Sequence, residues 1–142
     1  MARYRTSLAP NQRLRMSTPL ALADHPTIHV VDDDEAVRRS LAFLLEAASF
    51  TACVHASAAE FLATPAVAGC VLVDYDMPGI GGLELLRRLR LRGTTLPCIV
   101  ITGKHAAGMR EAAKALGAAA VIEKPFDSEA LILTIRKALS PT

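Results

Sequence analysis

Acidic, hydroxyl and lysine side chains follow short apolar runs at four places in this sequence. The groups are Asp32, Asp33 and Asp34 after residues 28–31, Asp74 and Asp76 after 70–73, Thr102 after 97–101, and Lys124 after 119–123. Carboxylates held together raise one another's pKa or require a cation, and an all-oxygen ligand set suits Mg²⁺. A carboxylate can also act as a nucleophile and form an aspartyl phosphate, whose oxygens a hydroxyl and an ammonium can stabilise. These residue types indicate metal-dependent phosphoryl chemistry if the fold brings them together.

The segments that must position these groups alternate between apolar runs and helix-period stretches. Strands are predicted over 28–31, 50–55, 70–73, 97–101 and 119–123, and helices over 37–48, from 57 to before 65, and over 83–91, 109–116 and 128–139. This alternation predicts βαβ units and a parallel sheet covered on both faces. The carboxyl ends of such strands share one edge, where ligands bind beside the topological switch point. We therefore expect the groups above to converge there.

Length and composition favour one globular domain. The chain has 142 residues, is 51% hydrophobic and 21% charged, and no apolar run approaches the roughly 18 residues of a membrane span. A formal net charge of +2 is too small to predict nucleic-acid binding. Residues 1–26 hold four arginines against one aspartate, so the remainder is slightly acidic. We expect 1–26 to be a flexible basic leader and 27–140 to form the domain.

Other reactive residue types receive structural interpretations. The three cysteines lie in predicted strands and are expected to be buried thiols in a reducing compartment: Cys53, Cys70 and Cys98. The four histidines show no ligand spacing and are assigned no role: His25, His29, His55 and His105. Four arginines are expected on a solvated helix face rather than a nucleic-acid stripe: Arg87, Arg88, Arg90 and Arg92.

Four sequence blocks carry a family resemblance. VVDDDEAVRRSL, VLVDYDMPGIGGLELL, IVITGK and AVIEKPF, in this order, resemble the receiver domain of response regulators (CheY-like) over about residues 27–139. The match is best with the receivers of nitrogen-fixation-type transcription regulators. The resemblance implies an α/β fold, a flavodoxin-like doubly wound five-stranded parallel sheet of order 2-1-3-4-5 with five helices.

The resemblance also implies roles for the acidic residues. Asp74 matches the phosphoacceptor, and Asp33 matches the direct Mg²⁺ ligand. Asp32 matches an acidic companion that acts through water, and Asp76 matches the position whose backbone carbonyl ligates the metal. Asp34 is interpreted as a helix N-cap instead of a ligand.

Two further positions match the parts that sense the phosphoryl group, and one departs from the pattern. Thr102 matches the switch hydroxyl, and Lys124 matches the lysine that bridges carboxylate and phosphate, with Lys124-Pro125 resembling the family's cis peptide. The position three before this lysine usually holds Tyr or Phe, but here it is Val121. The aromatic half of the switch is therefore missing, and we expect this to affect the amplitude or the route of signalling rather than phosphorylation.

These observations predict a cytoplasmic two-component receiver rather than a classical enzyme. It would take a phosphoryl group from a sensor histidine kinase or a histidine phosphotransfer protein, bind Mg²⁺, promote its own phosphorylation and dephosphorylation, and contact neither nucleic acid nor membrane directly. A weak homodimer is expected on the face of the fourth helix, fifth strand and fifth helix, which includes Ala112, Ala113 and Val121.

Two alternatives remain open at this point, and a third is excluded. The first is that the chain is a receiver fragment of a longer DNA-binding regulator, since no output domain fits before Thr142. A Mg²⁺-dependent phosphohydrolase with an aspartate nucleophile is disfavoured because its DxDx[TV] pattern lacks the hydroxyl here. A flavin-binding protein is excluded because the loop after the first strand is acidic, whereas a phosphate would need a loop rich in Ser, Thr and Gly there.

Overall fold

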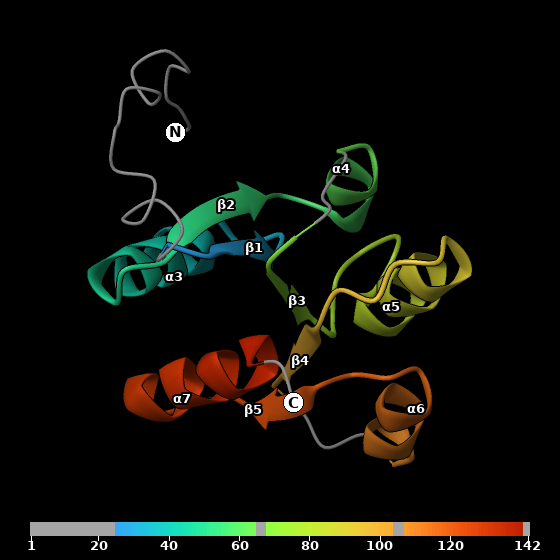
Figure 1. Ribbon diagram of the computed structural model, residues 1–142. Helices are drawn as coiled ribbons and strands as arrows, with labels where there is room; N and C mark the ends of the chain where they lie inside the picture. The colour runs from blue at the N-terminus through green and yellow to red at the C-terminus, as the bar shows by residue number, and fades with distance from the viewer. Residues whose placement is uncertain (1–24, 65–67, 104–106, 141–142) are drawn as a thin grey trace.

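The computed structural model describes residues 25–64, 68–103 and 107–140. Five parallel strands form one sheet in the order β2-β1-β3-β4-β5 (Figure 1). The strands are β1 (Thr27–Val31), β2 (Thr51–His55), β3 (Cys70–Asp74), β4 (Cys98–Thr102) and β5 (Ala120–Glu123). The helices of the described residues are α3 (Glu35–Ala47), α4 (Ala58–Leu62), α5 (Gly82–Leu91), α6 (Met109–Ala115) and α7 (Ser128–Leu139). The predicted order 2-1-3-4-5 and the five helices are confirmed; the expected leader lies almost wholly outside the described residues.

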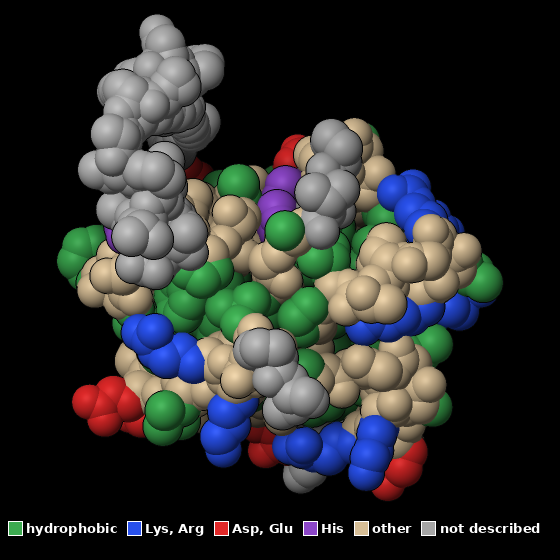
Figure 2. Space-filling view, viewed as in Figure 1, with side chains coloured by type: hydrophobic (Ala, Val, Ile, Leu, Met, Phe, Trp, Pro, Cys, Tyr) green, Lys and Arg blue, Asp and Glu red, His purple; other side chains and the backbone are tan. Residues whose placement is uncertain are grey.

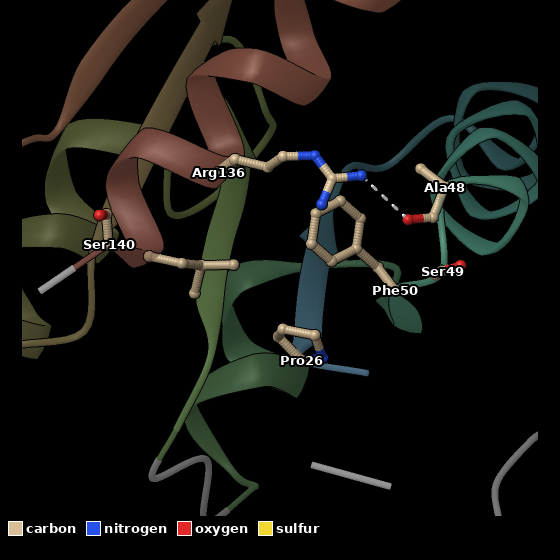
Figure 3. A pocket seen from close by; sticks show the side chains of 7 residues that line it. Pro26, Ala48, Ser49, Phe50, Arg136 and Ser140 are labelled. Carbon is tan, nitrogen blue, oxygen red and sulfur yellow. Dashed lines mark hydrogen bonds between the residues drawn. The ribbon is translucent and has the colours of Figure 1, made fainter. Parts of the chain in front are cut away.

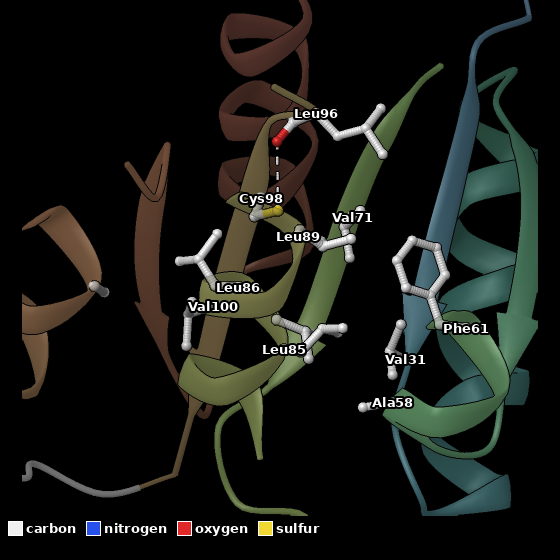
Figure 4. Packing of buried hydrophobic residues seen from close by; sticks show 12 residues of the cluster. Val31, Ala58, Phe61, Val71, Leu85, Leu86, Leu89, Leu96, Cys98 and Val100 are labelled. Carbon is white, nitrogen blue, oxygen red and sulfur yellow. Dashed lines mark hydrogen bonds between the residues drawn. The ribbon is translucent and has the colours of Figure 1, made fainter. Parts of the chain in front are cut away.

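Helices cover both faces of the sheet and enclose two apolar clusters. Helices α3 and α7 lie on one face, and α4, α5 and α6 lie on the other (Figure 1). In the cluster beneath α4 and α5, Phe61 lies beside Val31, and Leu85 and Leu89 lie over β3 and β4 (Figure 4). All five residues of β3 and of β4 are buried, as a parallel sheet covered on both faces requires.

The edge strand β2 corrects one prediction. Most residues of β2 are exposed, including Cys53. Cys70 and Cys98 are buried, as expected. Burial raises the pKa of the Cys70 thiol to about 12 and that of Cys98 to about 11. An edge strand has a neighbour on one side only, so an apolar run within it does not ensure burial. The interpretation of Cys53 as a buried thiol was wrong.

Capping side chains fix where three helices begin. The carboxylate of Asp34 accepts hydrogen bonds from the backbone of Ala36 and Val37 at the start of α3, which confirms its capping role. Ser57 accepts from the backbone N–H of Glu60 at 3.1 Å in α4, and Asp127 caps α7. Each cap satisfies backbone donors that the helix itself leaves unpaired.

The expectation that four arginines lie on one solvated helix face is wrong for Arg90, which is half-buried. Arg87 and Arg88 do lie at the surface and pair with Glu84. Arg92 is exposed as well, but both Arg90 and Arg92 donate to backbone carbonyls of neighbouring segments. The bonds are Arg90 to Leu116 (3.0 Å), Thr94 (3.1 Å), Leu96 (3.1 Å) and Gly117 (3.2 Å), and Arg92 to Leu62 (2.9 Å). Arg90 therefore ties the loop before β4 to the end of α6.

Candidate functional site

Three carboxylates meet at the carboxyl ends of β1 and β3. Oxygen atoms of Asp32, Asp33 and Asp74 all lie within 4.8 Å of one another. Asp32 and Asp74 are buried, with exposed fractions of 5% and 7%, while Asp33 is exposed. Strands β1 and β3 are hydrogen-bonded neighbours in the sheet and β2 lies on the far side of β1, so the cluster stands at the switch point where ligands bind in this fold.

Backbone and arginine hydrogen bonds hold the two acidic loops. The backbone N–H of Asp34 donates to the Asp32 carboxylate at 2.9 Å, and the N–H of Asp76 donates to Oδ1 of Asp74 at 3.4 Å. The guanidinium of Arg38 donates to the Asp32 carbonyl at 2.8 Å. The backbone hydrogen bonds thus orient the carboxylates of Asp32 and Asp74, whereas Asp33 is exposed to solvent.

A lysine and a threonine complete the site from β4 and β5. Lys124 Nζ lies 3.7 Å from Oδ1 of Asp74. The backbone N–H of Lys124 donates to the carbonyl of Thr102 at 2.8 Å, and Thr102 is fully buried at the end of β4. The peptide bond between Lys124 and Pro125 is cis, as expected.

Gly82 allows α5 to begin directly beside the acidic strand end. A Cβ atom built on Gly82 would lie 2.9 Å from the Asp74 carbonyl oxygen and 3.0 Å from Tyr75 Cα. Both are backbone atoms that cannot rotate away. Any larger residue would push the loop after Asp74 out of position.

Burial dominates the electrostatics of the two buried acids. It raises the pKa of Asp32, against a hydrogen bond from the Asp34 backbone and the charge of Lys124, both of which lower it. It also raises the pKa of Asp74, while Lys124 lowers that pKa and Asp32 raises it. One lysine does not offset three converging carboxylates, so a cation would stabilise the ionised cluster. All-oxygen donors in a partly open cluster fit Mg²⁺.

The structure brings together most of the predicted site and leaves some positions apart. Asp32, Asp33, Asp74 and Lys124 form one cluster, and Thr102 lies at the adjoining strand end. Val121 is half-buried in β5 and packs against the apolar cluster under α5.

On α6 one prediction was wrong. Ala113 is fully buried in that same apolar cluster, so it cannot contribute to an exposed dimer face, whereas Ala112 is exposed. Lys104, the last residue of the IVITGK block, lies outside the described residues.

Two supporting residues were missed from the sequence. Arg38 holds the Asp32 loop and Gly82 permits the approach of α5. Arg38 stands one helical turn after the cap Asp34, and that spacing was a signal that an arginine could reach back to the loop.

Two surface grooves lie elsewhere. One, of about 480 Å³, is at the opposite end of the sheet, where Arg136 lies over the Phe50 ring and donates to the Ala48 carbonyl (Figure 3). The other, of about 690 Å³, is an apolar groove between α3 and the segment Lys124–Phe126. Only the second touches a residue of the acidic site, at Lys124.

Fold and site together define a response regulator receiver. The model of the response regulator receiver domain family matches residues 28–136, and the chain belongs to this family. A receiver domain of this family is not a classical enzyme.

Several known relatives of the chain are FixJ transcriptional regulatory proteins. The chain is 48% identical over 114 residues to the transcriptional regulatory protein FixJ of Azorhizobium caulinodans, covering 79% of this chain and 54% of that protein. It is 46% identical to FixJ of Rhizobium meliloti, covering 79% and 56%. The crystal structure of FixJ-N superimposes with a TM-score of 0.75 at 42% identity, covering 80% of this chain and 92% of that one.

The chain spans about half the length of the curated relatives it matches. The same holds for full-length FixJ from B. japonicum, which is similar at a TM-score of 0.74 and 39% identity, with 57% of that chain covered. The similarity to FixJ therefore applies to the receiver part. None of the described helices is long and apolar enough to cross a membrane.

Proposed function

We propose that Asp74 accepts a phosphoryl group from a sensor histidine kinase or a histidine phosphotransfer protein. The observation that supports this most directly is the position of its carboxylate, buried at the end of β3 with Lys124 Nζ at 3.7 Å and two further carboxylates within 4.8 Å. One oxygen of Asp74 attacks phosphorus while the bond from phosphorus to the donor imidazole nitrogen breaks. The electron pair of that bond stays on the imidazole.

The other residues would stabilise the charge of the transferred group. Asp33 would hold Mg²⁺ directly with the Asp74 carboxylate and the Asp76 carbonyl, and Asp32 would bind it through water. When bound, the ion supplies positive charge to the phosphoryl oxygens. Lys124 would pair with one phosphoryl oxygen, and the hydroxyl of Thr102 would donate to another.

Signalling would follow from a shift between two conformations. A phosphoryl group favours the state in which Thr102 and Lys124 both contact it, and the shift is limited by that difference in affinity. Val121 has no ring to reorient, so we propose a modest change on the face of α6, β5 and α7. A weak homodimer on that face, with the exposed Ala112 at its surface, would depend only modestly on phosphate.

A second candidate is the receiver part of a longer DNA-binding regulator. The relatives are named transcriptional regulators and are about twice as long as the matched region. In this form the receiver would act in the cytoplasm without touching DNA itself and would control an attached output domain. The phosphohydrolase alternative stays disfavoured, because Pro78 stands where the DxDx[TV] pattern of that class places Thr or Val.

Intact-protein mass spectrometry after treatment with acetyl phosphate tests the proposal. Wild type with Mg²⁺ should gain one phosphoryl group, and chelation of the metal should prevent this. Asp74→Asn should gain none, while the matched control Asp34→Asn should behave as wild type because Asp34 caps α3. Phosphorylation of Asp74→Asn to the wild-type extent would contradict the assignment.

A further inference from the structure

Two histidines that are 26 residues apart in sequence lie side by side at the β1–β2 edge. Nδ1 of His29 is 3.4 Å from Nε2 of His55, and the ring centroids are 5.6 Å apart. The parallel register pairs His29 with Cys53, two residues before His55, so all three side chains point to the same face of the sheet. Histidine side chains reach the surface beside α4 (Figure 2).

The spacing of the two nitrogens fits a shared metal ion better than a hydrogen bond. An N–H donor usually lies within about 3.2 Å of its acceptor. Two imidazole nitrogens bound to one tetrahedral Zn²⁺ at about 2.0–2.1 Å would lie about 3.4 Å apart. The observed separation between His29 and His55 equals this value.

The chemical state of the pair also suits a metal. Burial lowers the pKa of both rings, and the charge of His29 helps to lower that of His55 to about 4. His29 also hydrogen-bonds the backbone of Ala68, the kind of outer contact that orients a metal-binding imidazole.

Packing fixes the rings while leaving access for an ion. The Phe61 ring lies 5.2 Å from the His29 ring and 5.1 Å from the His55 ring, centroid to centroid. His29 is buried and His55 is half-buried, so the pair opens to solvent through His55. The carboxylate of Glu60 is near enough to influence His55 and would complement a cation.

We propose that His29 Nδ1 and His55 Nε2 bind one divalent ion of the Zn²⁺ class. Imidazole ligands suit zinc and its neighbours, whereas Mg²⁺ prefers oxygen. The site therefore differs from the acidic cluster in its ligand chemistry, and it adjoins that cluster, because the backbone N–H of Asp32 donates to the carbonyl of His55 at 3.2 Å. Water would fill the remaining coordination positions.

Calorimetric titration with zinc chloride tests the site in the full chain. Asp33→Asn is used as the background, so that binding at the acidic cluster is weakened. One equivalent of zinc should bind, and His29→Gln or His55→Gln should each lower its affinity more than tenfold, because loss of an outer-shell contact alone costs that much. His25→Gln, which removes an exposed histidine outside the pair, should leave the affinity unchanged.

A second measurement needs no substitution and so is independent of folding. In nuclear magnetic resonance spectra of the wild-type chain, the imidazole signals of His29 and His55 should shift together at one equivalent of zinc, and those of His25 should not. The proposal is overturned if the two signals stay unchanged, if His25→Gln lowers affinity as much as His55→Gln, or if Asp33→Asn abolishes zinc binding. None of these results bears on phosphorylation of Asp74, so the two proposals fail separately.

Discussion

Replacing Arg90 with alanine should destabilise the domain far more than replacing its exposed neighbour Arg87. The Arg90 guanidinium is half-buried and donates to four backbone carbonyls, two before β4 and two after α6. Arg87 is 51% exposed and contacts only Glu84 among the described residues. Both substitutions remove an arginine side chain from α5, but they differ in the hydrogen bonds that are lost.

The expected loss follows from the hydrogen bonds. A fully buried bond to a charged group contributes about 1.5–3 kcal/mol. Because the carbonyls around Arg90 regain water when the side chain is removed, we expect each lost hydrogen bond to lower the free energy of unfolding by about 1 kcal/mol. The total loss is then about 2–4 kcal/mol. An exposed pair such as Arg87 with Glu84 contributes about 0–1 kcal/mol. For a domain of this size, the Arg90→Ala loss lowers Tm by about 8–16 °C.

Urea unfolding followed by circular dichroism measures both variants. Arg90→Ala should lower the midpoint strongly with an unchanged slope, and Arg87→Ala should barely move it. Arg90→Lys should recover little, because one ammonium cannot donate to both loops at once. The reasoning is refuted if Arg90→Ala costs no more than Arg87→Ala.

Three further predictions concern the site. Burial places the folded-state pKa of Asp74 above its unfolded value, so ionisation of Asp74 destabilises the fold above that pKa. Asp74→Asn should therefore be more stable than wild type at pH 7 without Mg²⁺, and the difference in stability should shrink as the pH falls through the folded-state pKa. Urea unfolding of both proteins at several pH values checks this. Asp33→Asn should weaken Mg²⁺ affinity at least tenfold more than Asp34→Asn in a metal titration, and equal losses would mean that the ligands are misplaced. Val121→Tyr should increase the phosphate dependence of dimerisation in sedimentation with and without a phosphoryl mimic; a wild type that passes from monomer to full dimer would show that the missing ring does not limit the switch.

The alternation of apolar runs with helix-period stretches was sufficient to predict the sheet, because its central strands are buried on both faces. The runs at 70–73 and 97–101 contain no charged residue, and each is followed directly by a polar group at the carboxyl edge. Once the strands are parallel, convergence of Asp32, Asp74 and Lys124 follows from topology alone. The helix starts were predictable because Asp34 and Ser57 are capping residues at the expected spacing.

Features that depend on long-range neighbours were not predictable in this way. Cys53 sits in an apolar run, yet β2 is an edge strand, and only the strand order reveals that. Arg90 shares a helix with solvated arginines, but its partners belong to loops up to 27 residues away. His29 and His55 meet only through the register of β1 with β2, because side-chain spacing along the sequence does not encode a cross-strand contact.

Chemical identification of the phosphorylated residue tests the central claim most directly. Borohydride reduces an acyl phosphate to an alcohol, so the modified aspartate becomes homoserine and is located by peptide sequencing in a mass spectrometer. After treatment with acetyl phosphate and Mg²⁺, homoserine should appear at position 74 alone. Homoserine at position 32, 33 or 76, or at none of them, would contradict the assignment of Asp74 as phosphoacceptor.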